Sequence, residues 1–138
     1  MNKKKYLVFA IIALILIVAV IIGIGYSRRT VFKRVISKAL NQYSWADNAR
    51  ASDDSYLKID TNPENDDPES ISYDSRTEQD SLKAIRYVNK ELGFSEAVYQ
   101  KMLSTTALMG RQSAENEKYI ITWTYHPQKG LEVMYEKK

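Results

Sequence analysis

The feature that most constrains this chain is an apolar stretch near its N-terminal end. From Leu7 to Ile24 it carries no charged and no polar side chain. A hydrophobic run of this length predicts a transmembrane helix, because a helix satisfies its own backbone hydrogen bonds inside lipid. Tyr6 and Tyr26 flank the stretch where interfacial aromatic residues lie, and basic residues follow outside them. We therefore expect residues 1–29 to be a membrane anchor with basic flanks, and the lipid bilayer to be a partner.

A cleaved signal peptide is the alternative interpretation of this stretch. Lysines precede it, as in a signal peptide, but its apolar run exceeds the usual length of about 7–15 residues. The run ends in Gly23-Ile24-Gly25, which leads into Tyr26 and basic residues rather than into a small-residue cleavage site. The prediction is thus an uncleaved single-pass anchor in the cell membrane.

The orientation of the anchor is set by the basic residues on its two sides. Counted alone, they favour a cytoplasmic C-terminal part, because more of them follow the apolar run than precede it. A short lysine cluster before one hydrophobic segment, however, is typical of a signal anchor. We expect the C-terminal domain to be extracytoplasmic.

The net charge of +3 is distributed unevenly along the chain. Residues 1–46 carry eight basic and no acidic side chains, residues 47–80 carry eleven acidic and three basic ones, and residues 81–138 carry nine basic and six acidic ones. The basic excess thus lies beside the anchor, where anionic lipid headgroups are a simpler partner than nucleic acid. The residues expected to contact headgroups are Arg28, Arg29, Lys33, Arg34 and Lys38.

Residue types that carry chemistry are scarce. The chain has no cysteine and one histidine, His126, which precedes a proline in a predicted turn. It has no glycine-rich phosphate loop, and no two carboxylates fall in a predicted cleft. Asp60, Asp66 and Asp67 are candidates for an irregular calcium site, with a solvated acidic linker as the alternative, because the EF-hand spacing is not met. We expect no cofactor, no catalytic residue and no enzymatic activity.

The stretch after the anchor has the spacing of an amphipathic helix over residues 30–46. Apolar pairs recur at Val31, Val35 and Ala39 and the residue after each, and the basic residues fall between them. One interpretation is a helix that continues from the membrane or packs on the soluble domain. The other is a juxtamembrane helix that lies in the headgroup region with its apolar stripe in the lipid.

Residues 47–76 are rich in Asp, Ser and Asn and predict an acidic linker. Tyr56–Ile59 interrupts it with an alternating pattern that predicts a short edge strand. The next stretch, Thr77–Leu92, predicts a helix, because Leu82, Ile85, Val88 and Leu92 share one face and Gly93 provides a stop. A second helix is expected from Ser95 to about Thr106.

The last part of the chain predicts a β-hairpin. Gly110–Glu117 is a polar loop by composition, and Lys118–Tyr125 alternates between apolar and polar residues. His126–Gly130 predicts a turn, and residues 131–136 alternate again. The expected fold class is α+β: a transmembrane helix and a small domain, residues 77–138, with two helices packed on the hairpin and a third strand as an option.

Aromatic residues of this hairpin are the candidate contacts with a protein partner, namely Trp123, Tyr125 and Tyr135. A place in the core is the alternative for each of them. Within the anchor, Ala19 and Gly23 have the small-xxx-small spacing that lets two helices approach closely, so a weak homodimer is a further expectation.

Several short motifs resemble a family of small uncharacterised proteins of Gram-positive bacteria. The resemblance covers roughly residues 55–138 and implies a bacterial origin and a compact domain, but no activity. It implies Arg and an acidic residue where this chain has Thr106 and Met109. The motifs that carry it are WTYHP at 123–127, GLEV at 130–133 with Tyr135-Glu136, Gly110–Ser113, Val88-Asn89 with Leu92–Phe94, and Ile59–Pro63.

The expected function follows from the anchor more than from the domain. We expect a single-pass membrane protein that holds a small interaction domain near an envelope or membrane protein partner. The alternative is a cytoplasm-facing regulatory subunit of a membrane complex, in which the anchor itself binds the partner.

Overall fold

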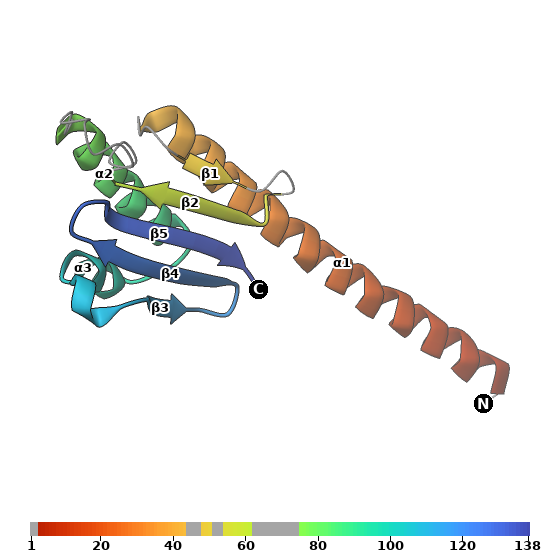
Figure 1. Ribbon diagram of the computed structural model, residues 1–138. Coiled ribbons are helices and arrows are strands. Elements are labelled where there is room, and N and C mark those ends of the chain that lie inside the picture. Colours follow the sequence, from red (N-terminus) through yellow and green to blue (C-terminus); the bar gives the residue numbers. More distant parts are fainter. Residues whose placement is uncertain (1–2, 44–47, 51–53, 62–74) are drawn as a thin grey trace. The chain divides into compact units, whose positions relative to one another are not determined.

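The computed structural model describes residues 3–43, 48–50, 54–61 and 75–138 (Figure 1). The chain divides into two compact units, Met1–Val31 and Phe32–Lys138. Helix α1, Lys3–Gln42, contributes to both of them. The second unit, here called the folded unit, holds all the other helices and strands that the structure describes.

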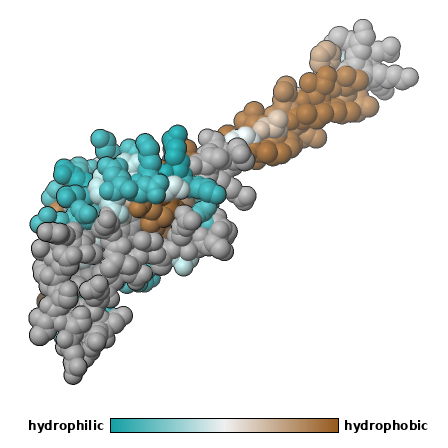
Figure 2. Space-filling view, turned by 90° about the horizontal axis from the view of Figure 1, so that it is seen from above, coloured by the Kyte–Doolittle hydropathy of each residue, from teal (hydrophilic) through white to brown (hydrophobic). Residues whose placement is uncertain are grey.

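The first unit contains a stretch that is long and apolar enough to cross a membrane. This is Tyr6–Ile24, 19 residues of α1, none of which is buried. Its hydrophobic side chains appear brown in Figure 2, whereas the described surface of the folded unit in that view is mostly hydrophilic. The helix predicted from the apolar run is therefore confirmed in length and composition.

The C-terminal part of α1 belongs to the core of the folded unit. Phe32, Val35, Ile36 and Ala39 are all buried. The Phe32 ring stacks on Tyr119 with 5.6 Å between ring centroids. The headgroup interpretation of this segment is wrong, because protein rather than lipid covers its apolar stripe. The folded unit thus begins at Phe32, well before the expected start at residue 77.

The folded unit is built on a five-stranded sheet with strand order β1-β2-β5-β4-β3, and every pairing is antiparallel. The predicted hairpin is present, with pairing from Tyr119 opposite Lys137 to His126 opposite Gly130. Gly130 has φ +75°, which the tight turn requires. The strands are β1 (Asn48–Arg50), β2 (Tyr56–Asp60), β3 (Gln112–Glu115), β4 (Tyr119–His126) and β5 (Gly130–Lys137).

Two expectations about the sheet are wrong. The strand predicted at Tyr56–Ile59 is an inner strand, because β1 pairs with its outer side. The polar loop expected at Gly110–Glu117 contains β3, which pairs with β4. Asn116 makes this second hairpin possible: its Oδ1 accepts from the backbone N–H groups of Lys118 and Tyr119, both at 2.9 Å. A side chain therefore closes the turn that the composition did not reveal.

The helices follow the predicted periodicity with small shifts at their ends. Helix α2 spans Ser75–Glu91, and Gly93, with φ +83°, provides the predicted stop. Helix α3 spans Glu96–Leu103 and so ends before the expected Thr106; just after it, the Thr105 hydroxyl donates to the Lys101 carbonyl at 2.7 Å. A 3₁₀ turn, η2, follows at Ala107–Met109. The two helices lie behind the sheet in Figure 1, and the expected α+β fold is confirmed.

The core lies between the helices and one face of the sheet. Ile59, Ile121 and Val133 from three neighbouring strands are fully buried, as are Ile85 and Val88 from α2. Residues on the other face, such as Lys58, Thr122 and Met134, are half-buried. Since paired residues share a face, the alternation predicted for the hairpin sorts its residues correctly.

Tyr135 is the largest fully buried side chain among the residues that the structure describes. Its hydroxyl donates to Asn89 Oδ1 at 2.8 Å and lies 3.2 Å from the Ile85 carbonyl oxygen. Burial raises the pKa of Tyr135 well above its ordinary value. The central strand is thus joined to α2 by a polar contact inside an apolar core.

We expect Tyr135→Phe to lower the free energy of unfolding by about 1–3 kcal/mol, because Asn89 Oδ1 would stay buried without its donor. Urea denaturation of the full-length protein in detergent micelles, followed by near-ultraviolet circular dichroism, measures the change. Tyr125→Phe is the control, since the Tyr125 side chain is partly exposed. Equal stability of the two variants would contradict the prediction.

Candidate interaction surfaces

The three aromatic residues predicted to contact a partner differ in exposure. Trp123 and Tyr135 are buried, so the prediction that they form a contact surface is wrong. The helices cover the sheet face that carries them, and Trp123 Nε1 donates to Thr105 Oγ1 at 2.8 Å. Tyr125 is 36% exposed and remains a candidate contact with a protein partner.

Tyr125 belongs to a group of exposed apolar residues that sequence reasoning missed. In the described part of the folded unit, the large hydrophobic side chains with substantial exposure are Leu103 (47%), Leu108 (100%), Met109 (55%) and Tyr125 (36%). They come from the end of α3, from η2 and from the end of β4, which lie at one end of the sheet in Figure 1. These four residues are called the apolar end patch below.

A shallow cavity of about 350 Å³ adjoins this patch. Leu103 and Tyr125 line it, together with Leu82, Pro127 and Leu131. Next to the cavity, Thr105 accepts from Trp123 and donates to the Lys101 carbonyl, so it ties the end of α3 to β4. The patch is therefore presented by ordered elements. Exposed clusters of large apolar side chains commonly mark interaction sites.

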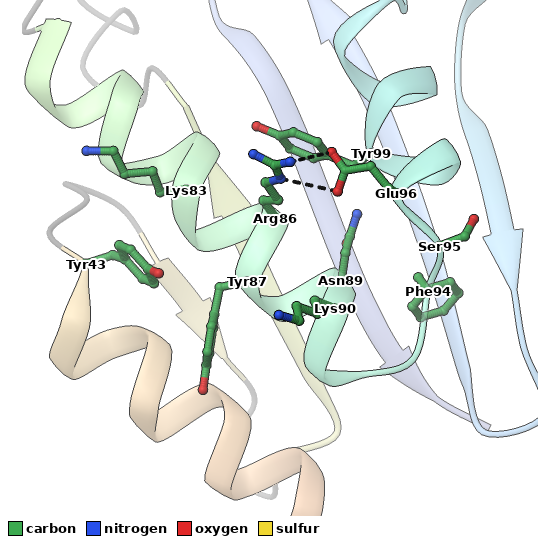
Figure 3. A pocket seen from close by; sticks show the side chains of 10 residues that line it. All are labelled: Tyr43, Lys83, Arg86, Tyr87, Asn89, Lys90, Phe94, Ser95, Glu96 and Tyr99. Atoms are coloured by element: carbon green, nitrogen blue, oxygen red, sulfur yellow. Dashed lines mark hydrogen bonds and ion pairs between the residues drawn. The ribbon is translucent and has the colours of Figure 1, made fainter.

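A larger pocket lies among the helices (Figure 3). It has a volume of about 620 Å³, within the range of ligand-binding pockets. It is lined from three places: Tyr43 after α1; Lys83, Arg86, Tyr87, Asn89 and Lys90 of α2; and Phe94, Ser95, Glu96 and Tyr99 around the start of α3. This cavity is called the helical pocket below.

Arg86 and Glu96 form the main polar contact of the helical pocket. Arg86 Nη2 lies 2.9 Å from Glu96 Oε1, and Arg86 Nε donates to Glu96 Oε2 at 3.2 Å. The guanidinium also lies 5.6 Å from the centre of the Tyr99 ring. Arg86 points toward α3 in Figure 3, so the contact joins the two helices. The hydrogen bond from Arg86 lowers the pKa of Glu96.

The α1 side of the helical pocket is aromatic. The Tyr43 and Tyr87 rings lie 5.8 Å apart in a tilted arrangement. The Tyr87 hydroxyl is buried without a hydrogen-bond partner in the described part of the chain, and it points toward α1 in Figure 3. Burial, followed by the charge of Glu91, raises the pKa of Tyr87.

The basic residues predicted to contact headgroups lie along α1. Lys33, Arg34 and Lys38 are exposed, and Lys33 Nζ lies 3.8 Å from Asp54 Oδ2. The side chains of Arg28 and Arg29 lie outside the described residues, as do Asp66 and Asp67 of the candidate calcium site. Asp60, at the end of β2, is buried. Among the described residues, no group of three or more His, Cys, Asp or Glu is placed to hold a metal ion.

Comparisons with protein-family models, curated proteins and solved structures gave no match to this chain. The resemblance to small proteins of Gram-positive bacteria stays a prediction. Met109, which stands where that resemblance implies an acidic residue, lies in the apolar end patch.

We expect Arg86→Gln to raise the pKa of Glu96 toward its ordinary value, because the variant removes the charged donor. The pKa of Glu96 is lower in the folded state than in the unfolded state. The ion pair therefore stabilises the fold fully at a pH above the unfolded-state pKa, and this stabilisation is lost as the pH falls through the folded-state pKa. Nuclear magnetic resonance titration of the Glu96 carboxyl measures the shift, with Lys118→Gln as the control. A Glu96 pKa that is the same in both variants would show that Arg86 does not cause the shift.

Proposed function

We propose that this protein is a single-pass membrane protein that holds a protein-binding domain at the membrane. The carrying observation is the exposed apolar stretch Tyr6–Ile24, which lies in the same helix that supplies Phe32–Ala39 to the core of the folded unit. A stretch of 19 exposed apolar residues is costly in water and stable in a bilayer. The shared helix supports a permanent tether.

The apolar end patch is the proposed contact with an envelope or membrane protein partner. The chain enters the folded unit at Phe32, which stacks on Tyr119 at the start of β4. Tyr125 lies six positions further along the same strand. At about 3.3 Å per residue, the patch is roughly 20 Å from the point where the anchor joins. Binding a partner through such a patch requires no catalytic group, in keeping with the expectation that the protein is not an enzyme.

The folded unit is proposed to lie on the extracytoplasmic side. Supporting this orientation is the lysine cluster before the single apolar segment, which is typical of a signal anchor. The exposed basic residues of α1 and the Ala19–Gly23 spacing keep their predicted roles, in headgroup contact and in weak dimerisation respectively. A Cβ added at Gly23 would meet nothing within 4 Å, so this face of the helix is open in the single chain.

We expect protease added to intact protoplasts to remove a tag placed after Lys138, because an extracytoplasmic unit is accessible from outside. Immunoblotting of the tag measures its loss, and a cytoplasmic protein in the same cells controls for lysis. A tag that resists protease until the cells are lysed would reverse the orientation. It would favour a cytoplasm-facing regulatory subunit of a membrane complex instead.

We expect a photoreactive amino acid at position 108 to form a discrete crosslink with another membrane or envelope protein, because Leu108 is fully exposed in the apolar end patch. Gel electrophoresis and mass spectrometry of the crosslinked species measure the result. Position 117 is the matched control, since Glu117 is exposed and lies in the β3–β4 turn, outside the patch. Equal crosslinking at the two positions, or none at 108, would contradict the proposed contact.

A further inference from the structure

The cationic side chains of the helical pocket lie on one face of α2. Lys83, Arg86 and Lys90 follow a spacing of three and then four residues, which places them on the same side of a helix. At about 1.5 Å per residue, the two lysines are roughly 10 Å apart along the axis. Among the described residues that line the pocket, Glu96 is the one with an acidic side chain. The described lining therefore carries more positive than negative side chains, spread over two helical turns.

The contact between Arg86 and Glu96 shows how the pocket receives a carboxylate. Both oxygens of Glu96 lie within 3.2 Å of Arg86 nitrogens, and Tyr99 supports the guanidinium from its ring face. Arg86 is thus already held in a geometry that suits a planar two-oxygen anion. The pair is exposed, with side-chain exposures of 62% and 52%. Exposed ion pairs stabilise little, so an incoming carboxylate can replace Glu96 at small cost.

Within the described part of the chain, neither lysine of the pocket is held by a buried ion pair. Lys83 Nζ contacts Asp80 Oδ1 at 3.2 Å in an exposed pair within one helical turn. Lys90 is exposed and makes no ion pair with the described part of the chain. A small anion would contact one of these three cationic side chains. Three cations spread over two helical turns instead suit a peptide that carries carboxylates at intervals.

Aromatic rings complete the pocket and favour a ligand with apolar groups beside its charges. Tyr43 and Tyr87 form one wall, and Phe94 and Tyr99 lie toward α3 (Figure 3). The aromatic walls and the volume of about 620 Å³ leave room for an apolar side chain of a ligand. The phosphate of a lipid headgroup alone would not fill this volume. This combination fits an acidic peptide that contains aromatic residues.

We infer that the helical pocket binds an acidic, aromatic-containing peptide segment of a partner protein, with carboxylates on Lys83, Arg86 and Lys90 and with Glu96 as the internal group that the peptide displaces. This site is separate from the apolar end patch, and it does not depend on which side of the membrane the folded unit occupies.

The test uses the full-length protein in nanodiscs of zwitterionic lipid and a synthetic peptide of alternating glutamate and tyrosine. Isothermal titration calorimetry measures the dissociation constant. We expect Lys83→Gln with Lys90→Gln to weaken binding by about tenfold or more, because two charge-assisted contacts are lost. Glu96→Gln is expected to tighten binding about threefold or more, since the neutral side chain competes less for Arg86.

The matched control for the double variant is Lys101→Gln with Lys118→Gln, which removes two exposed lysines outside the pocket. Unchanged affinity in this control, together with tighter binding by Glu96→Gln, supports the site. Equal weakening by both double variants would overturn it in favour of nonspecific attraction. Absence of peptide binding by the unaltered protein at millimolar concentration would also overturn it.

Two further arms distinguish other anions. If inorganic phosphate competes as well as the peptide does at equal concentration, the pocket is a small-anion site and the proposal is wrong. If the lysine variants change only the association of the protein with vesicles that contain anionic lipid, the cations serve the lipid surface and the proposal is wrong. None of these results depends on protease access in protoplasts, so the proposed extracytoplasmic orientation is tested independently of the pocket.

Discussion

Burial of one face of α1 against the sheet is the constraint on which the folded unit depends. Phe32, Val35, Ile36 and Ala39 give a small unit apolar surface that its other two helices do not supply. Without disulfides, a unit of this size has few other sources of stability. The same helix, α1, also contains the apolar stretch Tyr6–Ile24, so this stretch and part of the core belong to one element.

A buried polar contact determines how the helices meet the sheet. The Tyr135 side chain is fully buried, and its hydroxyl donates to Asn89 Oδ1 of α2. An apolar interface alone would tolerate small sliding of α2, whereas a buried donor must reach its acceptor or lose the contact. The Gly93 corner then sets the start of α3, and with it the approach of Glu96 to Arg86. The geometry of the helical pocket thus follows from the packing of the core.

The sequence predicted elements whose periodicity is strong and local. Helix α2 and the β4–β5 hairpin follow from the spacing of their apolar residues, and Gly93 and Gly130 have the expected backbone conformation. Strand β3 was missed because QSAE carries no apolar alternation, and its formation depends on the Asn116 turn. Strand β2 was expected at an edge because its neighbour β1 lies inside a polar stretch.

The interaction surfaces depend on contacts between distant residues, so they were harder to predict. Alternation placed Trp123 and Tyr135 on one face of the hairpin but could not show that helices cover that face. Leu108 is apolar, and only the packing of η2 against the rest of the unit determines that it is exposed. Arg86 and Glu96 lie on different helices, and their pairing requires the corner between them.

The position of β5 in the sheet has a consequence for biosynthesis. Of the five strands it comes last in chain order, yet it lies between β2 and β4 and joins them. A nascent chain that has been synthesised only as far as β4 holds at most two separate antiparallel pairs, β1–β2 and β3–β4, with no shared sheet. The apolar surface of α1 beyond Phe32 has no complete core to enter at that stage. The folded unit can therefore complete its sheet and its core only after β5 has been synthesised, and until then the incomplete unit is exposed to aggregation.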